Sequence, residues 1–383
     1  MFAQGFLRED AALQHPLEMH SSRLYRRQLL LRALSVGTLV SAASLPGSGW
    51  LLGRAQASPS ETSVRDGVLH IAVGGQGLLY YLPLVVAQQL GYFDAEGLRV
   101  MLHDHEGGVQ ALQAVSSGAA QICSGAYEHV LMEQAQARYF KAFVLLGRSP
   151  QMALGVSPRW MPQCRNMSKL AGSCIGVASM GSAVMHATQL ALLHHGLSID
   201  SVRFIDVGMG PAAASALQSG RVQAVAQPDP LISVLEERGD VQVICDLRNP
   251  TECEQIYGGS MPSAALYATE AFVQKYPAQA QGVANAMLRA LLWLQTASML
   301  DLVKLVPAHY WMGSRRAYLA AFEKMRLSIS PDGLMPAEGP AIAQRSLQRL
   351  YPALALPAGR RLLEPGRSYT NLFAQRARQK LRV

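Results

Sequence analysis

The sequence predicts an α/β protein built from two similar lobes that face each other across a cleft. The main observation is an internal repeat, since residues 69–124 and 173–227 share the order strand, helix, strand, helix, strand. The copies also agree in detail, because S-G-A-A-Q at 117–121 corresponds to S-G-R-V-Q at 219–223. Strands that alternate with helices favour mostly parallel sheets. Two such units indicate two lobes and a cleft between them.

The first copy has well-marked element boundaries. We expect strands at 69–73 and 98–102, because both segments are short and aliphatic. An apolar helix is expected between them, with Pro83 near its first turn and Gly91 after its end. Proline is favoured at the start of a helix and glycine just beyond its end, so these two residues bound the helix.

The second copy is bounded in the same way. Strands are expected at 174–178 and 202–205. Ser182 can cap the helix that Gly196 stops, because its hydroxyl can accept from the free backbone N–H groups of the first turn. Pro211 is expected to begin the next helix.

Two segments are expected to connect the lobes. Residues 141–157 form two extended apolar stretches separated by Arg-Ser-Pro at 148–150, and the chain should cross there to the second lobe. The loop 257–262, followed by apolar residues 263–268, should be the return. The predicted domains are therefore lobe one at 58–155 and 260–383, and lobe two at 156–259.

The C-terminal part is predicted to be helical. Apolar residues recur at helical spacing from 277 to 294, which is typical of a packing stripe. Further helices are expected at 315–325 and 338–351, supporting lobe one from outside. The basic stretch 375–382 is interpreted as a solvated terminal helix.

The composition fits a folded globular protein. The chain has 383 residues, of which 50% are hydrophobic and 16% charged, and this argues against disorder. Its net charge is +8, but no run of Lys and Arg with interleaved aromatic residues suggests nucleic acid as a partner. After the N-terminal region, no stretch is apolar and long enough to span a membrane.

The N-terminus is interpreted as an export signal at 1–57. Arg26-Arg27 precedes a weakly apolar stretch at 33–52, and Ala-Gln-Ala at 55–57 is a small-x-small cleavage site, so we expect cleavage after Ala57 and export to the periplasm. The paired arginines resemble a twin-arginine signal, and the general secretory route is the alternative. Met19 is a second candidate for the start of translation.

The five cysteines indicate neither a metal nor a redox site. None has C-x-x-C spacing, so we expect no metal, and disulfides or buried thiols are the alternatives. The first candidate disulfide is Cys245–Cys253 and the second is Cys164–Cys174. Cys123 falls within a predicted strand and is expected to be a buried free thiol.

The loops at the carboxyl ends of the predicted strands are the candidate binding site, since ligands of open parallel sheets bind there. These loops are rich in Gly and Ser and poor in nucleophiles, which favours binding of a small anion by backbone N–H groups. They contain no dinucleotide or phosphate-loop motif, so no cofactor is expected. The candidate ligand-binding residues are Gln76, Gly77, Tyr80, Glu106, Gly107, Ser124, Gly125, Tyr127, Ser179, Gly181, Ser182, Gln227 and Asp229.

Several candidates have a structural alternative. Ser124 and Ser182 could serve as N-caps, and Tyr80 and Tyr127 could be core or rim aromatics. Asp229 lies between two prolines, where it could cap the next helix or accept from a ligand amine. His186 is interpreted as a surface or packed residue.

Four motifs together resemble one family. They are the long segment Y-Y-L-P-L-V-V-A-Q-Q-L-G-Y-F-D-A-E-G-L-R-V at 80–100, L-A-G-S-C-I-G-V-A-S-M-G-S at 170–182, A-L-Q-S-G-R-V-Q-A-V at 216–225 and D-L-R at 246–248. They are similar to motifs of the periplasmic substrate-binding proteins of nitrate/taurine/sulfonate-type ABC importers and of the related thiamine-pyrimidine-precursor binders. The resemblance covers about 67–373.

The resemblance implies a type II periplasmic binding protein fold, with two similar lobes of mixed, mostly parallel sheets and a hinge. It also implies a monomeric receptor that closes over one small molecule, of the sulfonate, nitrate, pyrimidine or carboxylate class, and delivers it to an ABC permease in the inner membrane. Aliphatic-sulfonate binders tend to carry a Trp before the Asp-Pro of the last lobe-two loop, whereas this chain has Gln-Pro-Asp-Pro at 227–230, and no Arg lies in the candidate loops. A strongly anionic ligand would therefore depend on backbone N–H groups and hydroxyls.

Two other functions stay open. One is an enzyme on the same fold, but pyrimidine synthases of this kind carry a cysteine-rich motif and desulfinases a Cys in the first strand-to-helix loop, and this chain has neither. We therefore expect a receptor and not an enzyme. The other is a ligand-sensing subunit of a signalling system.

Overall fold

The structure is a computed structural model that describes residues 67–355 and 363–383. All of these residues belong to one compact unit, Ala57–Val383. The predicted export signal, the cleavage site after Ala57 and the alternative start at Met19 lie outside the described residues. No described helix is long and apolar enough to cross a membrane.

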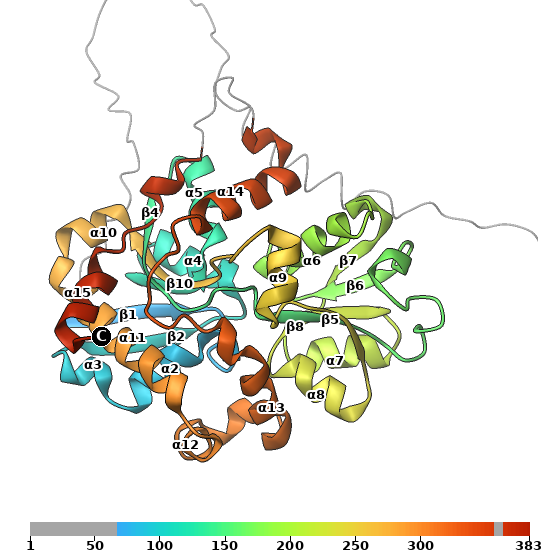
Figure 1. Cartoon of the computed structure of the whole chain (residues 1–383), viewed down its shortest axis with the longest axis horizontal. Coiled ribbons are helices and arrows are strands. Elements are labelled where there is room, and N and C mark those ends of the chain that lie inside the picture. The colour runs from blue at the N-terminus through green and yellow to red at the C-terminus, as the bar shows by residue number, and fades with distance from the viewer. Residues whose placement is uncertain (1–66, 356–362) are drawn as a thin grey trace, which may run out of the picture. The chain divides into compact units, whose positions relative to one another are not determined.

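The first sheet has five strands in the order β2-β1-β3-β10-β4 (Figure 1). Strand β1 runs parallel to β2 and β3, and β10 runs antiparallel to β3 and β4. The strands are β1 (Val68–Val73), β2 (Arg99–Asp104), β3 (Ile122–Ala126), β4 (Phe140–Leu145) and β10 (Ala264–Thr269). We call this sheet and the helices around it lobe one.

The second sheet repeats this pattern in the order β7-β6-β8-β5-β9. Strand β6 runs parallel to β7 and β8, and β5 runs antiparallel to β8 and β9. The strands are β5 (Met152–Val156), β6 (Cys174–Val177), β7 (Arg203–Asp206), β8 (Ala224–Pro228) and β9 (Gln242–Asp246). This sheet and its helices form lobe two. The predicted α/β fold of two similar lobes with mixed sheets is therefore confirmed.

The helices of the two repeats begin and end close to the predicted residues. The Ser182 hydroxyl accepts from Met185 N at 3.3 Å and caps α6, and Pro211 is the first residue of α7. Gly91 has a φ of +67°, a conformation that favours glycine. In lobe one the helices are α2 (Leu82–Gln89), α3 (Tyr92–Ala95), α4 (Gly108–Ser116) and α5 (Glu128–Ala135), and in lobe two they are α6 (Ala183–His194), α7 (Pro211–Gln218), α8 (Leu231–Arg238) and α9 (Pro250–Tyr257).

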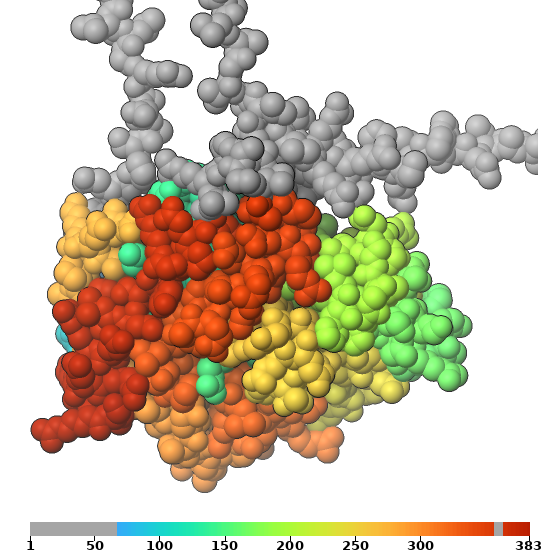
Figure 2. All heavy atoms as spheres, turned by 45° about the horizontal axis from the view of Figure 1, so that its top comes forward, coloured from blue at the N-terminus to red at the C-terminus, as the bar shows by residue number. Residues whose placement is uncertain are grey.

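The C-terminal helices contact both lobes. Helix α11 packs on α2, α3 and α15 of lobe one, but α13 lies against α8 and α14 lies against α5 and α6. In the space-filling view of Figure 2, orange and red C-terminal residues contact the yellow and green residues of lobe two. Helices α13 and α14, which were expected to support lobe one from outside, therefore also contact lobe two. The C-terminal helices are α10 (Glu270–Lys275), α11 (Pro277–Thr296), α12 (Met299–Leu305), α13 (Arg315–Met325), α14 (Gly339–Leu350) and α15 (Leu372–Leu381).

The contact between α13 and α8 is made by charged side chains. Lys324 Nζ lies 2.9 Å from Glu236 Oε2, and Arg316 forms a short ion pair with Glu237. The opposite side of α13 is apolar, because Tyr318 and Phe322 are buried in the core of lobe one. The helix therefore belongs to the core of lobe one and reaches lobe two through ion pairs at its surface.

All five cysteines are free and buried. The predicted disulfides Cys245–Cys253 and Cys164–Cys174 are therefore wrong, and the prediction of a buried free thiol at Cys123 is confirmed. Each site gives the thiol an ordinary partner or an apolar environment: Cys123 Sγ donates to Tyr267 Oη at 3.2 Å, and Cys164 Sγ lies 3.5 Å from Ser173 Oγ. A buried cysteine behaves as a small hydrophobic residue and needs no bridge.

Candidate functional site

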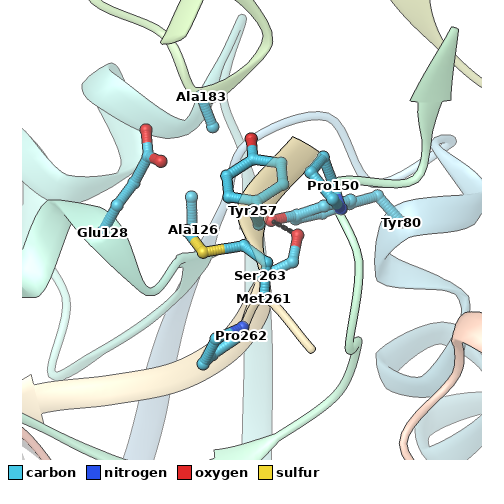
Figure 3. A pocket seen from close by; sticks show the side chains of 9 residues that line it. All are labelled: Tyr80, Ala126, Glu128, Pro150, Ala183, Tyr257, Met261, Pro262 and Ser263. Atoms are coloured by element: carbon cyan, nitrogen blue, oxygen red, sulfur yellow. Dashed lines mark hydrogen bonds between the residues drawn. The ribbon is translucent and has the colours of Figure 1, made fainter. Parts of the chain in front are cut away.

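A cavity lies where residues of both lobes meet, beside the carboxyl end of β3 and the first residue of α6 (Figure 3). The enclosed cavity has a volume of about 10 Å³, which is room for about one water molecule, and the 240 Å³ of space around it includes open solvent. A small organic ligand needs a pocket of about 300 Å³ or more, so it would enter only with the lobes further apart. The cavity is lined by Tyr80, Ala126, Glu128, Pro150, Ala183, Tyr257, Met261, Pro262 and Ser263.

Of the predicted site residues, Tyr80 is the one that lines this cavity, and several others lie next to residues that do. Tyr127 lies between Ala126 and Glu128, but its own side chain is buried and its hydroxyl forms a short hydrogen bond with Ser368 Oγ. Ser124 is also fully buried. Side chains of a strand alternate between its two faces, so the residue that faces a cavity is easily missed by one or two positions.

The loop after β1 does not present the free N–H groups that we expected. The Asp104 carboxylate, at the end of β2, accepts from Gly75 N at 3.2 Å and from Gln76 N at 2.6 Å. Gly74 lies so close to the next loop that a Cβ would be 2.4 Å from Gly108 N. The Asp104 carboxylate of the protein therefore occupies two of the N–H groups of this glycine-rich loop.

The remaining predicted residues of lobe one lie outside the cavity. A Cβ on Gly77 would lie 3.1 Å from Tyr310 Cδ1, and a Cβ on Gly125 would lie 2.5 Å from Tyr267 Oη. Glu106 is exposed, whereas Gly107 is buried. These positions shape the loops and give no side chain to the cavity.

The predicted residues of lobe two mainly satisfy each other. Ser179 O accepts from Ser182 N at 3.2 Å, and Gly181 N donates to the Met185 sulfur at 3.3 Å. Gln227 Nε2 donates to Gly208 O at 3.1 Å. The loop before α6 is therefore held by internal hydrogen bonds beside Ala183, which does line the cavity.

Asp229 is held by the protein as well. Its Oδ1 accepts from Ser233 N at 3.1 Å in the first turn of α8, and its Oδ2 pairs with Arg248 Nη1 at 3.4 Å. Burial raises the pKa of Asp229, and Arg248 opposes that shift. The carboxylate thus supports the loop and is not directed to a ligand.

Arg248, from the D-L-R motif, organises the end of β8. It is buried, and its guanidinium donates to Asp246 Oδ2 at 2.6 Å, to Glu236 Oε2 at 3.1 Å and to Ser233 Oγ at 3.0 Å. Buried charges require such pairing. The motif that supported the family resemblance is therefore a structural cluster.

A chain of three side chains connects the lobes beside the cavity, and the sequence interpretation missed it. Glu128 Oε1 in α5 lies 2.6 Å from His186 Nδ1 in α6, and His186 Nε2 lies 2.8 Å from the Tyr351 hydroxyl after α14. A carboxylate only accepts, so Nδ1 of His186 carries a proton and donates. The side chains of Glu128 and His186 are 7% and 2% exposed. The one local signal was the acidic Glu128 two residues after the end of the buried strand β3, and nothing nearby in the sequence pointed to His186.

Two tyrosines provide neutral hydroxyls to the cavity. Ser263 Oγ donates to Tyr80 Oη at 2.7 Å, which leaves the Tyr80 proton free to donate. Burial raises the pKa of both Tyr80 and Tyr257, so both phenols stay protonated at neutral pH.

The cavity offers recognition and no evident nucleophile. Burial raises the pKa of Cys123 to about 12, which keeps its thiol protonated and unreactive. Within 67–355 and 363–383, no group of three His, Cys, Asp or Glu side chains could hold a metal ion. The Glu128 carboxyl group and the hydroxyls of Tyr80, Tyr257 and Ser263 are the polar side-chain groups that line this space.

Comparison with known proteins agrees with this architecture. The family model described as "NMT1/THI5 like" matches residues 79–297. The chain belongs to the NMT1/THI5-like family. A structure from Bordetella bronchiseptica RB50 is 39% identical, with a TM-score of 0.76, and the match covers 83% of this chain and 98% of that one.

Two more distant structures show how widely the fold is used. The periplasmic aliphatic sulphonate binding protein SsuA from Escherichia coli is 21% identical, with a TM-score of 0.61 over 80% of this chain and 98% of that chain. The desulfurization enzyme DSZB is 18% identical, with a TM-score of 0.56 over 82% of this chain and 99% of that chain. The search of curated proteins found no match. The family match, with the fold shared by SsuA and by the periplasmic nitrate-binding protein NrtA from Synechocystis PCC 6803 (10% identical, TM-score 0.65 over 82% of this chain and 89% of that chain), confirms the predicted resemblance.

Proposed function

We propose that the protein is the exported solute-binding receptor of an ABC importer and captures a small polar organic molecule by closure of its two lobes. The observation that carries this proposal is the cavity lined by residues of both lobes, Glu128 and Tyr80 from lobe one and Ala183 and Tyr257 from lobe two. A ligand that contacts both lobes favours the closed state over the open one. The family supports the same function.

Closure would be stabilised by direct contacts between the lobes as well as by the ligand. Leu79 N donates to Asp229 O at 3.0 Å, and Glu128 meets His186 beside the cavity. In the proposed cycle these contacts form on closing and break when the ligand is released to the permease. The two chain crossings between β4 and β5 and between β9 and β10 would form the hinge.

The location and partners of the protein follow from the same proposal. An export signal cleaved after Ala57 would bring the chain to the periplasm, by the twin-arginine or the general secretory route. There it would act as a monomer and deliver its ligand to a permease in the inner membrane. The periplasmic sulphonate- and nitrate-binding proteins that share this fold support this location.

An enzyme on this fold is the main alternative, since DSZB shares it. The loop 74–80 contains no cysteine, and the buried Cys123 thiol has a raised pKa. These observations favour binding without turnover. A sensing subunit would bind its ligand in the same way and differ only in its membrane partner.

A thermal-shift screen tests the receptor function. Sulfonates, nitrate, aminopyrimidines, aromatic carboxylates and short amides are added separately to the purified protein. A ligand at 100 times its Kd stabilises the folded state by about 2.7 kcal/mol. For about 300 ordered residues this corresponds to a rise in Tm of about 4 °C.

A matched pair of variants locates the site. Ala183→Trp fills the cavity and should abolish the shift, whereas His194→Trp places the same side chain at an exposed position of the same helix and should keep it. Chemical conversion of a bound compound by the protein alone would contradict the receptor function. An equal shift in both variants would show that the ligand binds elsewhere.

A further inference from the structure

Glu128 gives the cavity a negative side chain without a positive counterpart in its wall. Among the described residues that line the cavity, Glu128 is the one with a charged group, and none is Lys or Arg. Figure 3 shows its carboxylate at one side of the space, with Ala183 near it and the Tyr80 and Tyr257 rings beyond. An anionic head group placed there would face a carboxylate of the same sign.

The Glu128 carboxylate is fixed in place. The described hydrogen bond of Glu128 joins its Oε1 to Nδ1 of His186. The Tyr351 hydroxyl in turn contacts Nε2, the other nitrogen of that ring. This leaves Oε2 for a ligand. A preorganised carboxylate binds an N–H donor without losing side-chain freedom, so His186 is a positioning residue.

Several backbone N–H groups of the candidate loops, which an oxyanion would use, are bound by carboxylates of the protein. Asp104, the last residue of β2, binds Gly75 N and Gln76 N. Asp206, the last residue of β7 and its counterpart in lobe two, accepts from Gly208 N at 3.2 Å. Carboxylates of the protein thus bind two N–H groups of the loop after β1 and one N–H group of the loop after β7.

The start of α6 is also partly occupied. Gly181 N donates to the Met185 sulfur, and Met185 N donates to Ser182 Oγ. The positive end of α5 carries Glu128 itself in its first turn, which is where a helix favours a negative charge. Both helix ends beside the cavity are therefore less suited to an external anion.

We infer that the ligand presents N–H donors, as an amidinium, an ammonium or a ring-bound amino group, to Oε2 of Glu128, and that oxyanions such as sulfonate and nitrate are disfavoured. This inference rests on the proposed receptor function and names its ligand class. Tyr80 and Tyr257, two neutral aromatic side chains, suit a flat or cationic body next to that head group. The inferred ligand class therefore differs from the aliphatic sulphonates of SsuA.

Titration calorimetry with matched probes tests the inference. Benzamidine and benzoate have nearly the same shape and opposite charge, and ethanesulfonate and nitrate represent the oxyanions. The wild-type protein should bind benzamidine at least 10-fold more tightly than benzoate and neither oxyanion measurably. Glu128→Gln should weaken benzamidine at least 10-fold, whereas Glu254→Gln, which changes an exposed carboxylate of α9, should leave it unchanged.

His186 provides a second measurement. His186→Asn keeps a donor near Glu128 and should retain more benzamidine affinity than His186→Ala, with both variants folded by circular dichroism. Tighter binding of benzoate, ethanesulfonate or nitrate than of benzamidine overturns the inference and leaves the receptor function intact. Binding of none of the four also overturns it, and the wider thermal-shift screen then decides the receptor function separately.

Discussion

The hydrogen bond between Glu128 and His186 should contribute measurably to stability, and His186→Ala tests this. The bond is short, at 2.6 Å, and both side chains are almost fully buried. A hydrogen bond to a charged group contributes about 1.5–3 kcal/mol, and removing one partner also leaves the other buried without compensation. The loss should therefore be about 3 kcal/mol.

This loss converts into an observable shift. The unfolding entropy is about 2.1 cal/mol/K per residue, so about 300 ordered residues give about 0.6 kcal/mol/K, and 3 kcal/mol lowers Tm by about 5 °C. Differential scanning fluorimetry and urea unfolding measure the change. Tyr351→Phe removes the outer bond to His186 and should cost about 1 kcal/mol.

A double-mutant cycle assigns the loss to the pair. Glu128→Gln and His186→Ala should together cost less than the sum of the single changes, with a coupling of about 1 kcal/mol or more. A Tm for His186→Ala within about 1 °C of the wild type would refute the reasoning, since it would mean that the lobes are not held together by this pair.

Three further results are expected. Gly74→Ala should destabilise the fold by about 2 kcal/mol or more in urea unfolding, because its Cβ would lie 2.4 Å from Gly108 N. The control Gly366→Ala should be near neutral, because its Cβ would meet nothing within 4 Å, and equal effects of the two changes would contradict this reasoning. All five thiols should react with a thiol reagent in denaturant without reductant, and a count of three would show a disulfide. Burial lowers the pKa of His129, so below pH 6.5 the unfolded chain binds a proton at this residue that the folded chain does not bind. The free energy of unfolding should therefore fall as the pH drops below 6.5, and His129→Gln should flatten this dependence.

The repeat allowed most of the fold to be predicted from the sequence. Strand ends, the Ser182 cap and the start of α7 depend on local residues, and the structure places them within one or two positions. The paired crossings could also be predicted, because extended apolar segments follow one another at 141–157. The domain boundaries themselves stay a prediction.

The candidate site was harder to predict, because its side chains come from residues that are far apart in the sequence. Strand β2 extends to Asp104, beyond the predicted end at 102, and its last side chain fills the loop at Gly75. Glu128 becomes a cavity residue only when α6 supplies His186 from 58 positions further along the chain. Such pairings depend on how the lobes meet, and no local pattern encodes that.

The position of β10 inside the first sheet also affects the order in which the two lobes fold. Strands β5 to β9 form the second sheet from one continuous stretch, 152–246, so lobe two can assemble as soon as that stretch is free. The first sheet has β10 between β3 and β4, and Ser124 on β3 pairs with Leu266 on β10. The first sheet is therefore complete only when β10, which follows lobe two in the sequence, pairs with β3 and β4. Contacts between residues so distant in sequence form slowly. We expect lobe two to gain protection from hydrogen exchange first during refolding, although it comes second in the chain.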